Sequence, residues 1–216
     1  MWVVFLGAPG SGKGTQVEIL TLKFGFVAVS TGDLIRANKE KVIDDGRTIE
    51  EIINTGALLP GHVTIELIEE EIERLDGRNV IFDGFPRTLE QADALSKMAD
   101  SSYEEVEKVI NFVMDDDVIL KRITGRFRCS ECGKIYNEFF NNTRIEGVCD
   151  VCRGTEFETR DDDNEESLRK RLCEYHEKTH PLIDFYDKSG ILYSVQADEA
   201  LDSVTKSVLK ILKIGE

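Results

Sequence analysis

The sequence GAPGSGKGT at residues 7–15 follows the apolar run WVVFL at residues 2–6 and precedes a helical pattern. This order predicts a buried strand, a glycine-rich loop and a helix. Glycines allow a tight turn whose backbone N–H groups point at an anion, while Lys13 and the helix N-terminus add positive charge. The stretch therefore predicts a loop that binds the phosphates of a nucleotide.

The residue after Lys13 sets this loop apart from the common pattern G-x-x-x-x-G-K-[ST]. Gly14 occupies that position, and the hydroxyl comes one residue later, on Thr15. A hydroxyl ligand for Mg²⁺ is therefore missing from its usual place. The alternative is a glycine-rich turn without a ligand, which the buried strand before it and the helix after it disfavour.

Further short apolar runs, at residues 26–29, 79–83, 108–114 and 191–195, alternate with helical patterns along the chain. Such alternation predicts an α/β fold, in which a parallel five-stranded sheet is flanked by helices on both faces. Helices are expected at 34–41 and 201–212. Residues 42–75 contain helical patterns and no apolar run of the strand type, which predicts a helical insertion projecting from the sheet.

Residues 127–159 interrupt this rhythm and contain four of the five cysteines, as two C-x-x-C pairs. The spacing suits a tetrahedral zinc site, and disulfides are the weaker alternative. About thirty residues bury too little surface to fold unaided, so we expect a small zinc-stapled domain. Its zinc ligands would be Cys129, Cys132, Cys149 and Cys152. The fifth cysteine, Cys173, is expected to be a buried apolar side chain.

Polar and charged residues follow the ends of the predicted strands, where open α/β sheets bind their ligands. Asp83 ends one strand and is expected to organise Mg²⁺ through water; its alternative role is to cap the next helix. Arg87 and Gln91 lie one helical turn apart and can face one cleft. Arg122 and Arg126 are spaced four apart, which predicts that they share one helix face.

Composition narrows the classes of partner. The chain of 216 residues has a formal net charge of −15, from 42 acidic and 27 basic side chains. Such a surface repels nucleic acids and anionic membranes, so neither is expected as a partner. The sequence contains no apolar stretch of the roughly 18 residues that a membrane span needs, and the expected location is the cytoplasm.

Four motifs together resemble the adenylate kinase family in order and across nearly the whole chain. They are GAPGSGKGT, STGD at 30–33 with Arg36, FDGFPRT at 82–88 with Gln91, and RDDDNEESLRKR at 160–171. The resemblance implies the reaction ATP + AMP ⇌ 2 ADP with Mg²⁺, catalysed by a monomer. It also implies a long form whose lid contains structural zinc. The implied division is a core of residues 1–30, 74–125 and 163–216, an AMP-binding domain of residues 31–73 and a lid of residues 126–162.

The resemblance also implies roles for single residues. Phosphoryl transfer would be catalysed by five cationic side chains: Lys13, Arg87, Arg126, Arg160 and Arg171. ATP would contact Gly10, Ser11, Gly12, Lys13, Gly14, Thr15, Arg122, Arg126, Ile135, Tyr136 and Glu199. AMP would contact Thr31, Arg36, the backbone of Ala57, Leu58 and Leu59, then Gly84, Phe85, Pro86, Arg87, Gln91, Arg160 and Arg171. Asp162 and Asp163 match lid-hinge acids that engage the arginines on closure.

The chain departs from the family pattern in two places. Leu59-Pro60-Gly61-His62 stands where the family usually has Val-Pro-Asp, and Gln196-Ala197-Asp198 stands where a glycine is usual. The second departure lies beside the expected contact of Glu199 with the ATP base, so it bears on donor selectivity. The alternatives are a GTP:AMP kinase, a UMP or CMP kinase, and a zinc-containing nucleotide sensor without turnover. Thr31 disfavours the pyrimidine kinases, which usually place alanine there.

Overall fold

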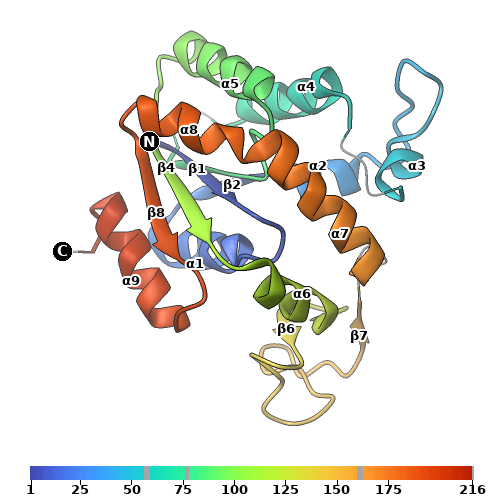
Figure 1. Ribbon diagram of the computed structural model, residues 1–216. Helices are drawn as coiled ribbons and strands as arrows, with labels where there is room; N and C mark the ends of the chain where they lie inside the picture. The colour runs from blue at the N-terminus through green and yellow to red at the C-terminus, as the bar shows by residue number, and fades with distance from the viewer. Residues whose placement is uncertain (56–58, 76–77, 160–162, 216) are drawn as a thin grey trace.

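The computed structural model describes residues 1–55, 59–75, 78–159 and 163–215. A five-stranded sheet with all strands parallel forms the centre, in the order β2-β3-β1-β4-β8 (Figure 1). Its strands are β1 (Trp2–Gly7), β2 (Val27–Ser30), β3 (Val80–Asp83), β4 (Val106–Val113) and β8 (Leu192–Gln196). The predicted fold, a parallel five-stranded sheet flanked by helices, is confirmed.

Helices cover both faces of this sheet because the side chains of β1 alternate between two apolar clusters. Val3 and Phe5 pack in a cluster with α1 (Lys13–Phe24) and α9 (Leu201–Leu212). Trp2, Val4 and Leu6 pack in the other cluster, with α4 (Gly61–Ile72), α5 (Leu89–Ser101) and α8 (Pro181–Lys188). The phosphate loop between β1 and α1 is therefore anchored in a core that is buried on both faces.

The first insertion has an apolar core of its own. The insertion contains the short helices α2 (Thr31–Ala37) and α3 (Ile49–Ile53), and α4 is its last helix. α2 begins three residues earlier than the expected helix at 34–41, because the Ser30 hydroxyl accepts a hydrogen bond from the Asp33 N–H at 3.3 Å and so caps it. The apolar core consists of Ile43, Ile49, Ile52, Leu59, Val63 and Leu67.

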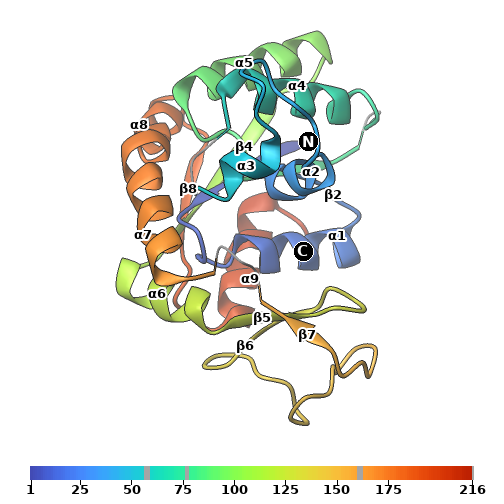
Figure 2. The same cartoon turned by 90° about the vertical axis from the view of Figure 1, so that its right-hand side faces the viewer.

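The second insertion contains a small antiparallel sheet in the order β6-β5-β7. Its strands are β5 (Arg126–Cys129), β6 (Ile135–Asn137) and β7 (Phe157–Glu158). In Figures 1 and 2 these strands lie at the bottom of the molecule, and α3 lies well above them. The buried Tyr136 packs with Cys129 and Cys149, and the partly buried rings of Phe127 and Phe157 contact Tyr136, the first stacked and the second edge to face.

Two expectations about side-chain placement were wrong. α6 (Asp116–Thr124) ends before Arg126, which instead begins β5 and pairs with Asn137 of β6; Arg122 and Arg126 therefore do not share a helix face. Helix-weakening Gly125 separates the two elements. Cys173, expected to be buried, is exposed on α7 (Glu165–Glu174), with its Sγ 3.4 Å from a carboxylate oxygen of Glu177.

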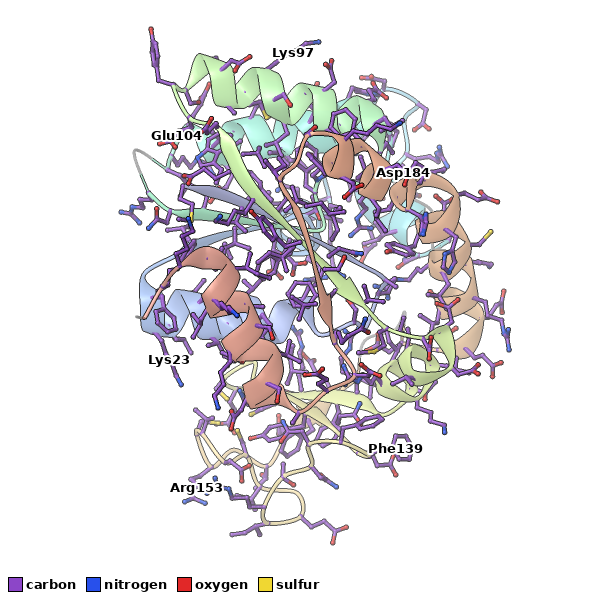
Figure 3. All side chains as sticks on the ribbon, turned by 60° about the vertical axis from the view of Figure 1, so that its left-hand side comes forward. Lys23, Lys97, Glu104, Phe139, Arg153 and Asp184 are labelled. Atoms are coloured by element: carbon purple, nitrogen blue, oxygen red, sulfur yellow. The ribbon has the colours of Figure 1, made fainter. Side chains whose placement is uncertain are left out.

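The helical segment after the lid is not one continuous α-helix. A turn of π-helix, η1 (Tyr175–Thr179), joins α7 to α8, and Pro181 opens α8. Charged side chains such as Lys97 of α5 and Asp184 of α8 project from the outer faces of the helices (Figure 3). No helix in the described part of the chain is long and apolar enough to span a bilayer.

Candidate active site

The phosphate loop adopts a conformation that its glycines make possible. Gly10 has φ of 81°, and a Cβ built on it would lie 2.8 Å from Cγ1 of Ile123. Gly12 has φ of 91° and caps α1 in the left-handed conformation. Both positions therefore require glycine, because a side chain would be strained in either backbone and would also clash at the first.

Lys13 is folded onto the loop that precedes it. Its Nζ donates hydrogen bonds to the carbonyls of Gly7 at 2.6 Å and Ala8 at 2.9 Å, and lies 3.4 Å from the Ser11 hydroxyl. Burial lowers the pKa of Lys13 from 10.5 to about 8. The loop therefore holds an ammonium group that is poorly solvated, which favours the binding of an anion.

Three arginines and one aspartate act on the same ammonium group. Arg87, Arg171 and Arg126 each lower the pKa of Lys13, whereas Asp83 raises it. The pKa of Arg87 is likewise lowered, first by burial and then by Arg171. These cations come from the loop, the segment after β3, the helix α7 and the lid strand β5. Because these like charges repel one another, the cluster is electrostatically unfavourable without a ligand. A bound polyanion would offset this repulsion.

Strand order explains how Asp83 reaches this cluster. β3 lies between β1 and β2, and Asp83 is in register with Phe5 on one side and Ser30 on the other. The alternative that Asp83 caps the next helix is wrong. Thr88 caps α5, since its hydroxyl accepts a hydrogen bond from the N–H of Gln91 at 3.2 Å.

The expected AMP-binding residues near the end of β3 are connected to one another. The Thr31 hydroxyl donates to the carbonyl of Gly84 at 2.8 Å, and Arg87 Nε donates to the same carbonyl at 2.8 Å. The Arg87 N–H donates to Oε1 of the buried Gln91 at 2.7 Å. One network therefore brings together four of the predicted residues on the rim of the sheet.

Other predicted AMP contacts lie in the first insertion and in the segment that follows β3. Arg36 forms an ion pair with Asp33 at 2.5 Å. Phe85 is fully buried in the main core, with Pro86 following it through a cis peptide bond, and the Leu59 side chain is buried in the core of the first insertion. Phe85 and Leu59 can therefore meet a ligand only through their backbones. Ala57, Leu58, Arg160 and Asp162 lie outside the described residues.

The expected donor-side residues come from the lid and the end of α6. Ile135 is exposed, but the Tyr136 ring is buried and its hydroxyl lies 3.3 Å from the Cys149 sulfur, so only its backbone is available to a nucleotide. Burial lowers the pKa of Arg122, and Asp198 raises it. Glu199 is exposed just before α9.

Arg126 is held where the lid meets α7. Its Nε donates to Oδ2 of Asp163 at 2.7 Å, and its Nη2 donates to the other carboxylate oxygen. The Asp163 side chain is only 2% exposed. A guanidinium that donates two hydrogen bonds to one buried carboxylate has a fixed orientation.

The four lid cysteines form a cluster whose ligand atoms all lie within 4.8 Å of one another. Two sulfur–sulfur distances, between Cys129 and Cys152 and between Cys132 and Cys149, are both 3.5 Å. Four thiolates around zinc at about 2.3 Å stand roughly 3.8 Å apart in a tetrahedron. The cluster therefore has the donors and the spacing of a structural zinc site.

Sequence reasoning missed residues that support the site without carrying a recognisable motif. The buried Thr179 of η1 donates to the carbonyl of Arg87 at 3.0 Å. Asn137 of β6 donates to the carbonyl of Arg122 at 2.6 Å. Lys134 of the lid pairs with Glu18 of α1 at 3.0 Å. These contacts join elements far apart in the sequence, so no local pattern could have revealed them.

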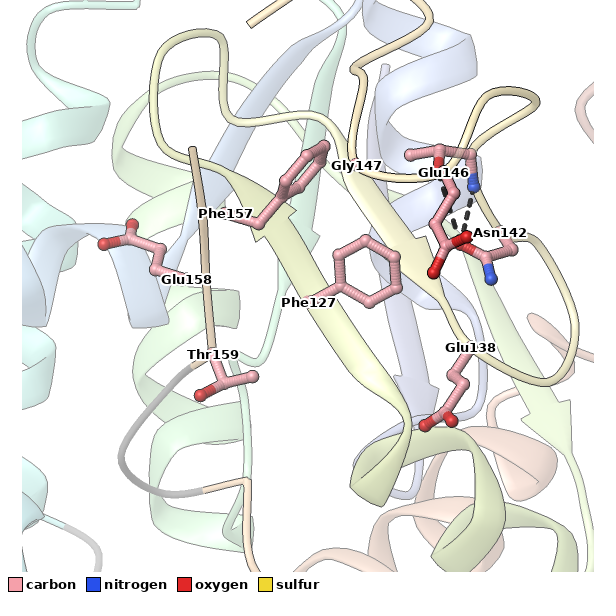
Figure 4. A pocket seen from close by; sticks show the side chains of 9 residues that line it. Phe127, Glu138, Asn142, Glu146, Gly147, Phe157, Glu158 and Thr159 are labelled. Carbon is pink, nitrogen blue, oxygen red and sulfur yellow. Dashed lines mark hydrogen bonds between the residues drawn. The ribbon is translucent and has the colours of Figure 1, made fainter. Parts of the chain in front are cut away.

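A hollow of about 410 Å³ opens in the lid rather than beside the phosphate loop. Phe127 and Phe157 line it together with Glu138, Glu146 and Glu158 (Figure 4). None of the predicted nucleotide contacts lines this hollow. The candidate active site is therefore defined by the charged groups that surround Lys13, and not by the lid hollow.

Comparison with known proteins gives matches along the whole chain. The family model described as adenylate kinase matches residues 5–191. A protein named adenylate kinase from Borrelia turicatae is 43% identical over 213 residues, covering 98% of this chain and 99% of its own. A protein of the same name from Thermodesulfovibrio yellowstonii is 41% identical and covers 99% of this chain and 99% of its own length. Another, from Caldicellulosiruptor bescii, is 40% identical and covers 99% of this chain and 100% of its own length.

Proposed function

The chain belongs to the adenylate kinase family, and we propose from this premise how its residues transfer a phosphoryl group. It is an enzyme of the transferase class, an ATP:AMP phosphotransferase that forms two ADP. In the transfer, the bond between the β,γ-bridging oxygen and the γ-phosphorus of ATP breaks. A bond forms between that phosphorus and a phosphate oxygen of AMP.

The donor would bind on the side of the phosphate loop and the lid. The N–H groups of residues 10–15 and the ammonium group of Lys13 would hold the phosphates, as the helix N-terminus favours. Arg122 and Arg126 would cover the base and the phosphates. Ile135, the backbone of Tyr136 and a backbone carbonyl at Glu199 would flank the adenine.

AMP would bind at the network on the rim of the sheet. Thr31, Arg36, the backbone of residues 57–59 and the segment from Gly84 to Arg87 would surround it, and Gln91 would read the adenine edge. Arg160 and Arg171 would contact its phosphate from the lid side. The support is the set of bonds that joins Thr31, Gly84, Arg87 and Gln91 in one place.

The observation that carries this proposal is the convergence of Arg87, Arg126 and Arg171 on Lys13. In phosphoryl transfer, the protein forms no covalent bond; it aligns the two substrates and neutralises charge on the migrating group. Lys13 would follow the transferred group, while Arg87, Arg126, Arg160 and Arg171 would surround it. Closure of both insertions would exclude water as a competing acceptor.

Metal ions would have two separate roles. Mg²⁺ bound with ATP would neutralise part of the phosphate charge, and Asp83 would orient its waters, which accounts for the missing hydroxyl after Lys13. Zinc held by Cys129, Cys132, Cys149 and Cys152 would be structural, with every coordination position taken by protein.

The division of the chain that supports this mechanism is the one expected from the sequence. Residues 31–73 would form the AMP-binding domain, residues 126–162 the lid, and residues 1–30, 74–125 and 163–216 the core. The separate apolar core of the first insertion and the cysteine cluster of the second support two units that move independently of the sheet. We also propose that the enzyme is a cytoplasmic monomer, as the family resemblance implies.

The experiment that tests the function is a matrix of substrates. Purified protein with Mg²⁺ is assayed with AMP, CMP, UMP and GMP as acceptors and ATP and GTP as donors. We expect ADP from ATP and AMP at the highest kcat/KM of all pairs. A preference for UMP or CMP, a preference for GTP, or nucleotide binding without turnover would each favour one of the alternatives over this assignment.

A further inference from the structure

We propose that Asn137 and Phe140 of the lid are positioning residues for Arg122, and that they set the affinity for the donor nucleotide without taking part in the transfer step. The inference rests on the proposed function, in which Arg122 covers the donor. It adds two residues that carry no motif of the phosphate site. It also gives the lid a second task besides supplying Arg126.

Asn137 uses its amide to join two parts of the chain. Its Nδ2 donates to the main-chain carbonyl of Arg122 at 2.6 Å. That carbonyl belongs to the last turn of α6, where carbonyls have no partner within the helix. The Asn137 Oδ1 accepts from the N–H groups of Phe139 at 2.9 Å and Phe140 at 3.2 Å. A single side chain therefore ties the end of α6 to the turn that carries Phe140.

The main chain fixes this turn as well. Asn137 is paired with Arg126 in the antiparallel ladder of β5 and β6. The N–H of Asn137 donates to the carbonyl of Asn141 at 2.9 Å, and the reverse bond is 3.1 Å. The Glu138 N–H donates to the carbonyl of Gly125 at 2.8 Å, directly after α6. The turn is therefore bonded to the end of α6 through its main chain as well as through the Asn137 side chain.

Phe140 lies under the Arg122 guanidinium. The distance from Cζ of Arg122 to the ring centroid is 5.4 Å, within the range of a cation–π interaction. On the loop side, Nη1 of Arg122 lies 3.6 Å from a Cβ built on Gly12. Asp198 also acts on Arg122 from the loop before α9. The guanidinium is thus held between an aromatic ring of the lid and the phosphate loop.

This arrangement predicts a selective effect on the donor. A long arginine side chain loses rotamer entropy when it binds a ligand, and a preformed orientation reduces that loss. Neither Asn137 nor Phe140 belongs to the network of Thr31, Gly84, Arg87 and Gln91, so AMP binding does not depend on them. The expected signature is a higher KM for ATP with unchanged KM for AMP and nearly unchanged kcat.

The test uses variants that remove one contact at a time. Asn137→Asp keeps the oxygen that accepts from the turn but places an acceptor against the Arg122 carbonyl. Phe140→Leu removes the aromatic ring, and Phe140→Tyr restores it. Phe139→Leu is the matched control, since Phe139 is a neighbouring exposed aromatic residue (Figure 3) whose ring lies beside Gly125, whereas the ring at the Arg122 guanidinium is that of Phe140.

The measurements are KM for each substrate, ATP binding in the absence of AMP by calorimetry, and the NMR shift of the Arg122 Nε–H. We expect KM and Kd for ATP to rise about two- to fivefold in Phe140→Leu and about tenfold in Asn137→Asp. Phe140→Tyr and Phe139→Leu should stay within about twofold of the parent. The ring-current shift of the Arg122 Nε–H should be lost in Phe140→Leu and retained in Phe140→Tyr.

Other outcomes separate this inference from the proposed function. ATP affinity unchanged in both variants, with zinc content and melting temperature retained, would overturn it. A parallel rise of both KM values would also overturn it, because that result means general damage to the lid. If Asn137→Asp does not fold, the Phe140 pair carries the test alone. Absence of turnover in the parent would instead refute the proposed function, and ATP binding would still test the positioning role.

Discussion

The two insertions that flank the phosphate loop are stabilised by different means. The first encloses six buried apolar side chains, two from α3, two from α4 and two, Ile43 and Leu59, from the segments between helices. The lid has three aromatic rings and two buried cysteines, with four sulfur atoms gathered at one point. Two segments of similar length can therefore serve one site with very different cores. The amphipathic helices of the first insertion supply apolar area, whereas the short strands of the lid bury little and bring together four sulfur atoms that could hold a metal.

The largest effect is expected where both regions deliver charge to the same place. Arg87 comes from the rim near the first insertion and Arg126 from the lid. Changing either to alanine should lower kcat by at least about a hundredfold, because each removes charge stabilisation from the transition state. Steady-state kinetics with ATP and AMP measures this loss, and circular dichroism checks the fold.

Arg128→Ala provides the matched control for the lid arginine. Arg128 lies on the same strand β5, but its Nε donates to the exposed Glu158 at 2.6 Å, and its side chain is 40% exposed. Its loss should change kcat by less than about threefold, since exposed ion pairs contribute little. Near-normal turnover in Arg126→Ala, or equal losses in Arg126→Ala and Arg128→Ala, would contradict the role given to Arg126.

The next largest effect tests whether the four cysteines stabilise the lid by binding zinc. The protein should contain about one zinc per chain, and Cys129→Ser should remove it. Because metal binding and folding of the lid are coupled, the melting temperature should fall by at least about 5 °C. Elemental analysis and calorimetry measure the two quantities. Cys173→Ser, which changes an exposed cysteine outside the cluster, should alter neither. Zinc-free protein with an unchanged melting temperature would mean that the lid needs no metal.

A smaller effect tests the apolar core of the first insertion. Ile49 is fully buried in the first insertion, and Ile49→Val removes one methylene group from that core. The expected loss is about 1 kcal/mol of unfolding free energy, or roughly 2–4 °C in melting temperature. Zinc content should not change. Val42→Ala, at a position 60% exposed in the same insertion, should cost much less. Loss of zinc in Ile49→Val would show that the two insertions do not fold independently.

Sequence reasoning succeeded where the evidence is local. The glycine loop, the strand runs and the C-x-x-C pairs each lie within a few residues, and their physical meaning does not depend on distant contacts. It failed at Arg126, because helical spacing was extended beyond Gly125 into a strand that forms by pairing with the distant strands β6 and β7. It failed at Cys173, because apolar character gives no information on which helix face meets the core. Asn137 and Thr179 could not be found, since their partners are distant in sequence or belong to the main chain.

The smallest expected effect is a change in the protonation of Lys13, on which Arg87 from the rim and Arg126 from the lid both act. Its pKa is about 8 in the folded protein and 10.5 when unfolded, so between these values the unfolded chain binds more protons. The stability contribution of Lys13 therefore rises with pH across that window and is lowest below pH 8. Phosphates placed beside the ammonium group raise its pKa again.

ATP binding at pH 8.5 should thus take up a fraction of a proton, whereas at pH 6.5 Lys13 should take up none. Calorimetry in buffers of different ionisation enthalpy measures the uptake, and Lys13→Met should abolish it. Equal heats in all buffers at pH 8.5 would mean that ATP binding does not change the charge of Lys13, and so that burial does not lower the pKa of Lys13 in the free protein.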